Sequence, residues 1–171
     1  IGEIDGVVER LLKVRRDNGT QGRSDYLSSL LEASDVEGKP LSPQQIRDEA
    51  VTVLLAGHET TALTMTWALY LLARHPEIQS RVVAEVRTLL RNRSATSADM
   101  QGLSLTQGVI LESMRLYPAG WVFGREATED CEIAGYHCPK GTTIMILPWV
   151  LHRDSRYYEN ADRFDPDRWL A

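Results

Sequence analysis

The 171-residue sequence predicts a mainly α-helical fold with a small β region. Two observations lead to this prediction. Stretches with apolar residues at helical spacing follow one another from Glu3 to Tyr117, and short β-like runs begin only after Pro118. The composition, with 43% hydrophobic and 25% charged residues, is that of a globular chain. We therefore expect five helices before the first strand.

We interpret the chain as one incomplete domain, 1–171, made of four consecutive parts. Helices and a loop occupy 1–41, three further helices occupy 42–117, short strands occupy 118–151, and an irregular tail occupies 152–171. The tail is rich in Asp, Arg, Pro and aromatic residues, and its pattern predicts no regular element.

The first part contains two amphipathic helices. The segment from Glu3 to Arg16 and the segment from Asp25 to Glu32 each carry an apolar stripe at helical spacing. The polar stretch from Ala33 to Leu41 is predicted to be a loop.

The longest predicted helix begins after Ser42. A hydroxyl N-cap at Ser42, proline at the first helical position and Gln45 three residues after the cap are three start signals together. No proline interrupts the pattern from Pro43 to Arg74. Beyond Val51 apolar residues cover every face, so we expect this helix to be buried on all sides.

Two more helices follow. The first runs from Pro76 to about Arg91, with Arg81, Glu85 and Arg87 expected to face water. A polar connector, 92–104, leads to the second, which runs from Leu105 to Tyr117 and ends at Pro118. The predicted strands are 121–125, 131–134 and 142–147.

Composition narrows the class of protein. The formal charge is −5 and the chain has no basic block, so we expect no nucleic-acid partner. The longest uncharged stretch near the apolar centre, 60–73, is shorter than the roughly 20 residues of a membrane-spanning helix, and we expect no membrane segment in this chain. The first residues do not have the pattern of a signal peptide.

The two cysteines, Cys131 and Cys138, have six residues between them, unlike the close pairs of zinc or redox sites. A disulfide across a small hairpin is conceivable. Because no secretory signal is present, we expect both cysteines to be reduced and structural.

The segment Ala56-Gly57-His58-Glu59-Thr60-Thr61 places a glycine and a carboxylate in the middle of an apolar helix. Gly57 and Thr60 share a face, so a flat ligand could approach the backbone beside a hydroxyl. The alternative is a glycine-mediated helix crossing with a satisfied polar pair. A zinc-protease interpretation of His58-Glu59 fails because Ala62 stands where the second histidine is required.

Glu112 and Arg115 are three residues apart on the last predicted helix, and Gly108 on the same face permits close packing. The tail segment 164–169 contributes Arg168. A glutamate that bridges two arginines would hold the irregular tail to this helix, in a structural rather than a catalytic role.

Arg125 follows an apolar run, where it could hold a carboxylate of a bound ligand. The alternative is a solvated arginine at a strand end. His75, His137 and His152 are assigned no ligand role, and no metal site is expected within the chain.

In their order and spacing these segments resemble the C-terminal half of a cytochrome P-450, a haem-thiolate monooxygenase. The segment 56–60 is similar to the oxygen-binding motif of that family, Glu112 to Arg115 to its Glu-x-x-Arg motif, and 164–169 to its meander. The resemblance implies an incomplete P-450 fold and haem b as cofactor, with the iron-binding cysteine expected beyond residue 171.

The resemblance also implies roles for single residues. Thr60, assisted by Glu59, would deliver protons to dioxygen, Ala56 and Gly57 would lie against the haem, and Arg125 would bind a haem propionate. Glu112, Arg115 and Arg168 would form a buried stabilising triad.

The implied reaction inserts one oxygen atom into an organic, apolar substrate. Electrons would come indirectly from NAD(P)H, through a ferredoxin or a flavoprotein reductase. The location would be cytoplasmic in a bacterium, with an upstream membrane anchor left open. A rival hypothesis is a non-catalytic helical binding or structural module, in which the same residues serve packing only.

Overall fold

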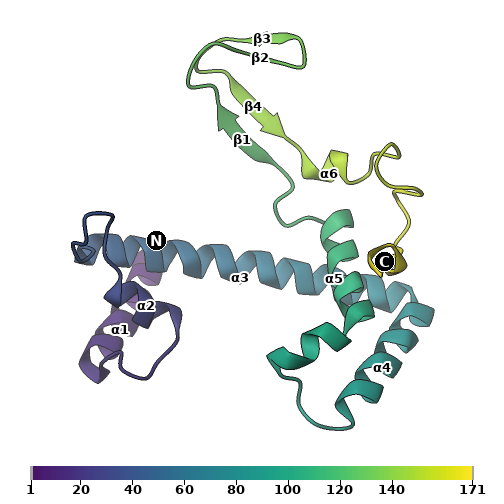
Figure 1. The fold of residues 1–171 in the computed structure, drawn as a ribbon, viewed down its shortest axis with the longest axis horizontal. Helices are drawn as coiled ribbons and strands as arrows, with labels where there is room; N and C mark the ends of the chain where they lie inside the picture. Colours follow the sequence, from purple (N-terminus) through teal and green to yellow (C-terminus); the bar gives the residue numbers. More distant parts are fainter. Residues whose placement is uncertain (1, 171) are drawn as a thin grey trace. The chain divides into compact units, whose positions relative to one another are not determined.

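The computed structural model describes residues 2–170 (Figure 1). Contacts divide the chain into two compact units, 1–59 and 60–171, and the division falls within one long helix. Ile1 and Ala171, the ends of the predicted domain, lie outside the described residues. The predicted fold class is confirmed, since several helices precede the first strand and the strands are few and short.

The first unit contains α1 (Gly2–Asn18), α2 (Tyr26–Glu32) and the beginning of α3 (Pro43–Arg74). Its core joins all three helices and consists of Val8, Leu12, Leu30, Ile46 and Ala50. The start of α3 follows the predicted capping pattern. The Ser42 backbone N–H donates to Oε1 of Gln45 at 2.9 Å, and the Gln45 backbone N–H donates to the Ser42 hydroxyl at 3.3 Å.

The predicted bounds of α3 are confirmed, but the expected burial of its middle is wrong. Val53, Leu55 and Met65 are 41%, 51% and 60% exposed. Apolar residues on every face predict a helix that is covered when folded. Here no segment of the described chain covers these positions, and burial is confined to the two ends of α3, at Ile46 and Ala50 and at Ala68 and Leu71.

In the second unit, α5 (Ser104–Leu116) is the central element. α4 (Pro76–Leu90) and the 3-10 helix η1 (Ser97–Gly102) pack against it, and the core consists of Ala68, Leu71, Ile78, Val109, Leu116 and Phe164. Glu85 of α4 does not simply face water, as its spacing predicts. Its carboxylate accepts the backbone N–H groups of Leu105 at 2.7 Å and Thr106 at 2.9 Å, and so caps the start of α5.

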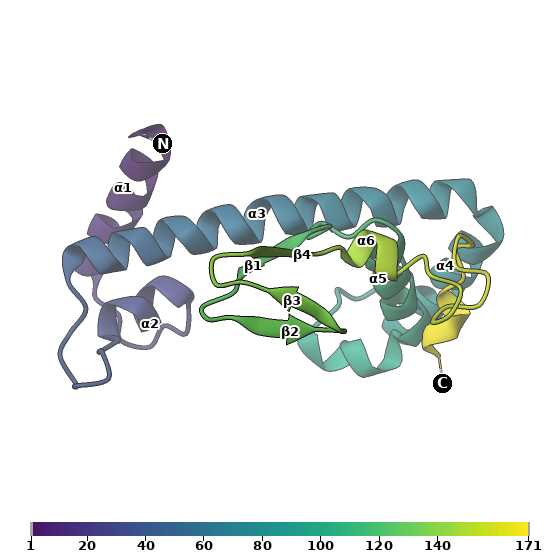
Figure 2. The ribbon, with the colours of Figure 1, turned by 90° about the horizontal axis from the view of Figure 1, so that it is seen from above.

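The strands form two antiparallel pairs (Figure 2). β1 (Phe123–Glu126) pairs with β4 (Thr143–Ile146), and between them the chain forms a hairpin of β2 (Cys131–Ile133) and β3 (Tyr136–Cys138). The sequence analysis missed β3, because only three residues separate the Ala134-Gly135 turn from Pro139. Both cysteines are free, as expected.

The tail contains more regular structure than the sequence predicts. A single helical turn, α6 (Pro148–Leu151), precedes it, and a 3-10 helix, η2 (Pro166–Trp169), lies against α5. Asp165 caps η2 by accepting the backbone N–H of Asp167 at 3.3 Å. None of the helices in the described part of the chain is long and apolar enough to cross a membrane.

Candidate functional site

A cavity of about 810 Å³ lies within the second unit, beside α5. This volume is in the range of about 300–1,000 Å³ usual for small-molecule and cofactor sites. Its wall is largely apolar and includes Leu111, Met114, Pro118, Ala119, Phe123 and Pro148. Polar groups come from Thr60, Thr61 and Thr64 of α3, and from Arg115, His152, Tyr158 and Trp169. An apolar cavity with a few polar groups suits a large, mostly apolar ligand with polar ends.

Among the polar residues of this cavity, His152 has a buried nitrogen atom, Nδ1, without a hydrogen-bond partner among the described residues. A buried polar atom without a partner costs free energy, roughly 1–3 kcal/mol. Since the ring also lines the cavity, a ligand with a hydrogen-bonding group at this edge would satisfy it.

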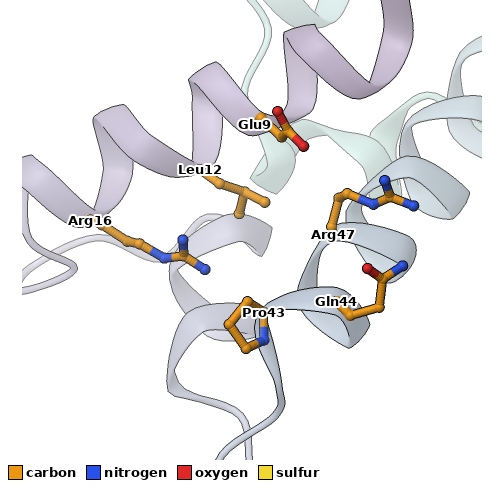
Figure 3. A pocket seen from close by; sticks show the side chains of 6 residues that line it. All are labelled: Glu9, Leu12, Arg16, Pro43, Gln44 and Arg47. Carbon is orange, nitrogen blue, oxygen red and sulfur yellow. The ribbon is translucent and has the colours of Figure 1, made fainter. Parts of the chain in front are cut away.

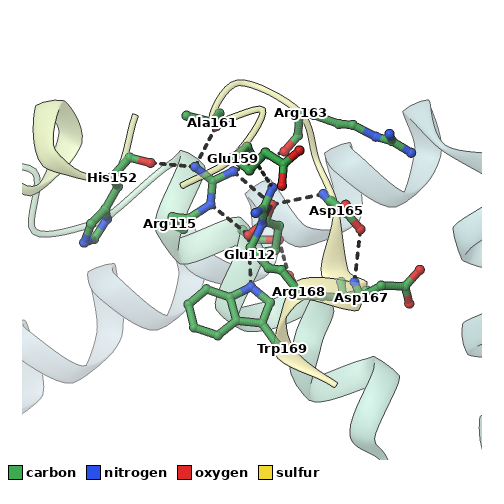
Figure 4. A network of polar contacts seen from close by, with 12 residues as sticks. Glu112, Arg115, His152, Glu159, Ala161, Arg163, Asp165, Asp167, Arg168 and Trp169 are labelled. Carbon is green, nitrogen blue, oxygen red and sulfur yellow. Dashed lines mark hydrogen bonds and ion pairs between the residues drawn. The ribbon is translucent and has the colours of Figure 1, made fainter. Parts of the chain in front are cut away.

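A buried network of hydrogen bonds underlies the cavity and is centred on Glu112 (Figure 4). The carboxylate accepts hydrogen bonds from Nε of Arg115 at 2.8 Å and from Nε of Arg168 at 3.0 Å. It also accepts the backbone N–H of Asp165 at 3.0 Å and Nε1 of Trp169 at 2.9 Å. The structure therefore brings Glu112, Arg115 and Arg168 together, as the sequence interpretation expects, and adds Trp169.

Arg115 holds the backbone of the tail. Its Nη1 donates to the carbonyl oxygens of His152 and Ala161, both at 2.6 Å, and its Nη2 donates to the carbonyl oxygen of Arg163 at 3.1 Å. The residue is only 2% exposed. Its position fixes the backbone of His152, and thereby one wall of the cavity.

The balance of forces at Glu112 favours the charged form. Burial by itself would raise the pKa of this carboxyl, but the hydrogen bonds from Arg115, Asp165, Trp169 and Arg168 hold the pKa below its ordinary value. Glu112 is therefore a buried carboxylate with partners on both oxygens. Its role is to hold α5 and the tail together.

Gly108 allows the tail to reach this carboxylate. A Cβ atom at Gly108 would lie 2.7 Å from the backbone oxygen of Pro166, closer than real Cβ atoms approach. Only glycine at this position of α5 lets η2 pack so near. The close packing expected at Gly108 is thus confirmed, and its partner is the backbone of η2.

The other predicted site residues lie along α3. Ala56, Gly57 and Glu59 belong to the first unit and Thr60 to the second. A Cβ atom at Gly57 would meet no atom within 4 Å, so nothing among residues 2–170 packs against it in a helix crossing. Glu59 is exposed, and Thr60 lines the cavity.

Arg125 is exposed in β1 and does not line the cavity. Its Nη1 donates to the carbonyl oxygen of the adjacent Gly124 at 2.8 Å. In the described residues this arginine has no carboxylate partner, and the structure leaves both sequence interpretations of it open.

A smaller cavity, of about 310 Å³, lies in the first unit between α1 and the start of α3 (Figure 3). Its wall combines four polar side chains with two apolar ones: Glu9, Arg16, Gln44 and Arg47, and Leu12 and Pro43. Arg47 already pairs with Asp48 at 2.8 Å, so its charge is partly balanced. The wall of this cavity is less apolar than that of the larger one. No group of three metal-binding side chains occurs among the described residues.

The sequence interpretation missed His152, Tyr158 and Trp169 as residues of the site. They lie in the segment predicted to be irregular, where no periodicity indicates which side chains share a face. The expected pairing of Glu112 with Arg168 is the one sequence signal that could have found them. If Glu112 binds the tail, the aromatic and histidine residues of the tail also lie near α5.

Comparison with known proteins agrees with this architecture. The cytochrome P-450 family model matches residues 2–171. The pentalenene oxygenase of Streptomyces avermitilis is 44% identical over 97% of this chain, and the cyclooctat-9-en-7-ol 5-monooxygenase of Streptomyces melanosporofaciens is 41% identical over 96%. In both cases the chain spans only 36% of the relative.

A solved structure of a zebra fish cytochrome P-450 with progesterone superimposes on 99% of this chain with a TM-score of 0.86 and 26% identity, and 42% of that chain is covered. The match extends over the helices, the strands and the tail alike. This chain belongs to the cytochrome P-450 family.

Proposed function

We propose that the protein containing this chain is a haem-dependent monooxygenase that inserts one oxygen atom of dioxygen into an organic, largely apolar substrate. The observation that carries the proposal is the cavity of about 810 Å³ with an apolar wall, the Thr60 hydroxyl and an unpartnered His152 nitrogen. Membership of the cytochrome P-450 family supports it. The rival hypothesis of a non-catalytic module has no support from the relatives.

The residues of the cavity fit a haem group. A flat, mostly apolar macrocycle with carboxylate side chains needs an apolar wall and hydrogen-bond donors at one edge. Leu111, Met114 and Phe123 supply part of the wall, and His152 Nδ1 supplies a hydrogen-bonding atom. Haem, when bound, supplies the redox chemistry of oxygen activation.

Thr60 is the residue proposed to act on protons. Thr60 lines this largely apolar cavity, and a threonine hydroxyl can pass a proton between a donor and a bound ligand. Glu59 precedes it in the chain, is exposed, and is proposed to assist Thr60. Ala56 and Gly57 complete the proposed haem-facing part of α3, and Arg125 remains the proposed partner of a haem propionate.

The buried triad has the positioning role in this proposal. Glu112 and Arg168 hold η2 on α5, and Arg115 fixes the carbonyl of His152. By fixing the tail they keep one wall of the cavity in place. Electrons are proposed to come from NAD(P)H through a ferredoxin or a flavoprotein reductase.

The test compares Thr60→Ala with Thr64→Ala in the haem-loaded protein. Both threonines line the cavity, and Thr64 lies one helical turn after Thr60 in α3, which makes it a matched control. We expect Thr60→Ala to keep its haem and its carbon monoxide difference spectrum, while electrons are diverted from product to hydrogen peroxide. Thr64→Ala should keep the ratio of product formed to NAD(P)H consumed.

Equal coupling in Thr60→Ala and the parent protein would contradict the proton-delivery role. Absence of haem from the purified parent protein, or a complete gene without a cysteine in a glycine-containing loop after the tail, would contradict the monooxygenase proposal as a whole.

A further inference from the structure

The hairpin of β2 and β3 places the two cysteines of the chain directly opposite each other. In its register Cys131 pairs with Cys138, Glu132 with His137, and Ile133 with Tyr136. Directly opposite residues of an antiparallel pair point to the same face. The proposed monooxygenase function makes no use of this arrangement.

The turn determines the kind of pair. Ala134 and Gly135 both have positive φ, 50° and 83°, as a two-residue turn of type I′ requires. Ile133 and Tyr136 flank this turn and form a hydrogen-bonded pair. Along an antiparallel ladder hydrogen-bonded and non-hydrogen-bonded pairs alternate, so Cys131 and Cys138, two positions further on, also form a hydrogen-bonded pair. Such pairs have Cα atoms about 5.5 Å apart, inside the range of roughly 4.4–6.8 Å that a disulfide spans.

The register is fixed from the other end as well. The carboxylate of Asp130 accepts the backbone N–H of Lys140 at 2.8 Å, just outside the cysteine pair. Further along, the backbone N–H of Ala127 donates to Thr142 at 3.0 Å, and that of Gly141 donates to Ala127 at 2.8 Å. A slip by one residue would break these bonds, so the two cysteines stay opposite each other.

Neither cysteine is in a disulfide, and both residues are half-buried. The Cys138 thiol donates a weak hydrogen bond to the Tyr136 carbonyl oxygen at 3.6 Å, a bond that is given up when the thiol reacts. We propose that Cys131 and Cys138 form a reversible disulfide with a low-molecular-weight disulfide such as oxidised glutathione as the oxidant.

In this step one cysteine thiolate attacks the glutathione disulfide and releases one glutathione. The second cysteine thiolate then attacks the mixed disulfide at the cysteine sulfur and releases the other. Two cysteine thiols are oxidised, one oxidised glutathione is reduced to two thiols, and the two protons go to these thiols. The new bond closes a loop from residue 131 to residue 138, and the Cβ atoms of the two cysteines approach each other by a local adjustment of the hairpin.

The test uses the protein containing this chain, equilibrated in glutathione buffers, then alkylated and digested with trypsin. Cleavage after Arg125 and Lys140 yields one peptide, Glu126–Lys140, with both cysteines. We expect oxidised glutathione to convert this peptide to an unalkylated form two hydrogen atoms lighter than the dithiol. A peptide that is doubly alkylated, or that carries glutathione, would overturn the proposal.

The matched control moves one thiol to the other face of the hairpin. In the double variant His137→Cys, Cys138→Ser the two cysteines are nearly as close in sequence, but residues 131 and 137 point to opposite faces. We expect disulfide formation in this variant to need a ratio of oxidised to reduced glutathione at least about ten times higher than in the parent protein. The reason is that two cysteines on opposite faces cannot adopt the geometry of a disulfide without strain. Equal closure in the two proteins would show that the pairing in the hairpin does not direct the bond.

Discussion

Helices α3 and α5 each contain an internal glycine, and these two glycines have opposite surroundings. At Gly108 of α5 a side chain would collide with the backbone oxygen of Pro166, while at Gly57 of α3 it would meet nothing within 4 Å. The neighbours differ in the same way: Val109 is 2% exposed, whereas Leu55 is 51% exposed. One glycine serves contacts inside the described chain, and the other is in contact with no other segment of residues 2–170.

An apolar pattern in a helix indicates that the helix is packed against other groups, but it does not indicate whether those groups belong to the same chain. Both helices are rich in apolar residues, yet within residues 2–170 α5 buries one face along its length, whereas the middle of α3 has no buried residue. For α5, the sequence also contains the partners, because Glu112 and Arg115 bind a tail that lies later in the same chain. For the middle of α3, the apolar pattern predicts that other groups pack around the helix, but it does not identify them.

The largest expected effect comes from removing the arginine that holds the tail. Arg115→Leu leaves the Glu112 carboxylate with fewer donors and three tail carbonyls without their partner, and breaking a buried pair costs on the order of 3–5 kcal/mol. We expect loss of haem incorporation and a large fall in the free energy of unfolding, measured by urea denaturation of the protein containing this chain.

The control for this variant is Arg81→Ala. Arg81 also joins a helix to the tail, through Asp167 at 2.6 Å, but both side chains are about half exposed. An exposed pair contributes about 0–1 kcal/mol. Similar losses in the two variants would show that burial of the Glu112 network does not set its contribution.

A smaller effect is expected from the glycines themselves. Gly108→Ala forces η2 away from α5, and such overpacking costs about 1–3 kcal/mol whether or not haem is bound. Gly57→Ala should leave the stability of the haem-free protein unchanged or raise it by up to about 1 kcal/mol, and should lower haem content. Thermal unfolding and haem absorbance of each variant separate the two outcomes. The comparison fails if Gly57→Ala destabilises the haem-free protein as much as Gly108→Ala.

The most gradual effect is expected at acid pH. Because the pKa of Glu112 is held below its ordinary value of 4.5 by its hydrogen bonds, its contribution to stability is complete above that value. As the pH falls below about 4.5, the carboxyl becomes protonated in the unfolded state before it does so in the folded state. Proton binding then stabilises the unfolded state, and the contribution of Glu112 to the free energy of unfolding is lost. Unfolding curves between neutral and acid pH should show this loss, and Glu112→Gln should remove part of it. An unchanged acid dependence in Glu112→Gln would assign the effect to other carboxyl groups.

The sequence predicts the fold class, the bounds of α3 and the pairing of Glu112 with two arginines. These features depend on local spacing, on proline and on capping residues, all of which are visible along the chain. The capping role of Glu85 and the position of His152 in the cavity wall depend on contacts between distant segments. No periodicity indicates such contacts, and so the sequence could not predict them.

Arg115 holds the tail through peptide carbonyls at 152, 161 and 163, and not through the side chains of these residues. Every amino acid offers the same carbonyl. The backbone at these three positions can therefore keep its path while mutation changes their side chains, as long as the Arg115 guanidinium is retained.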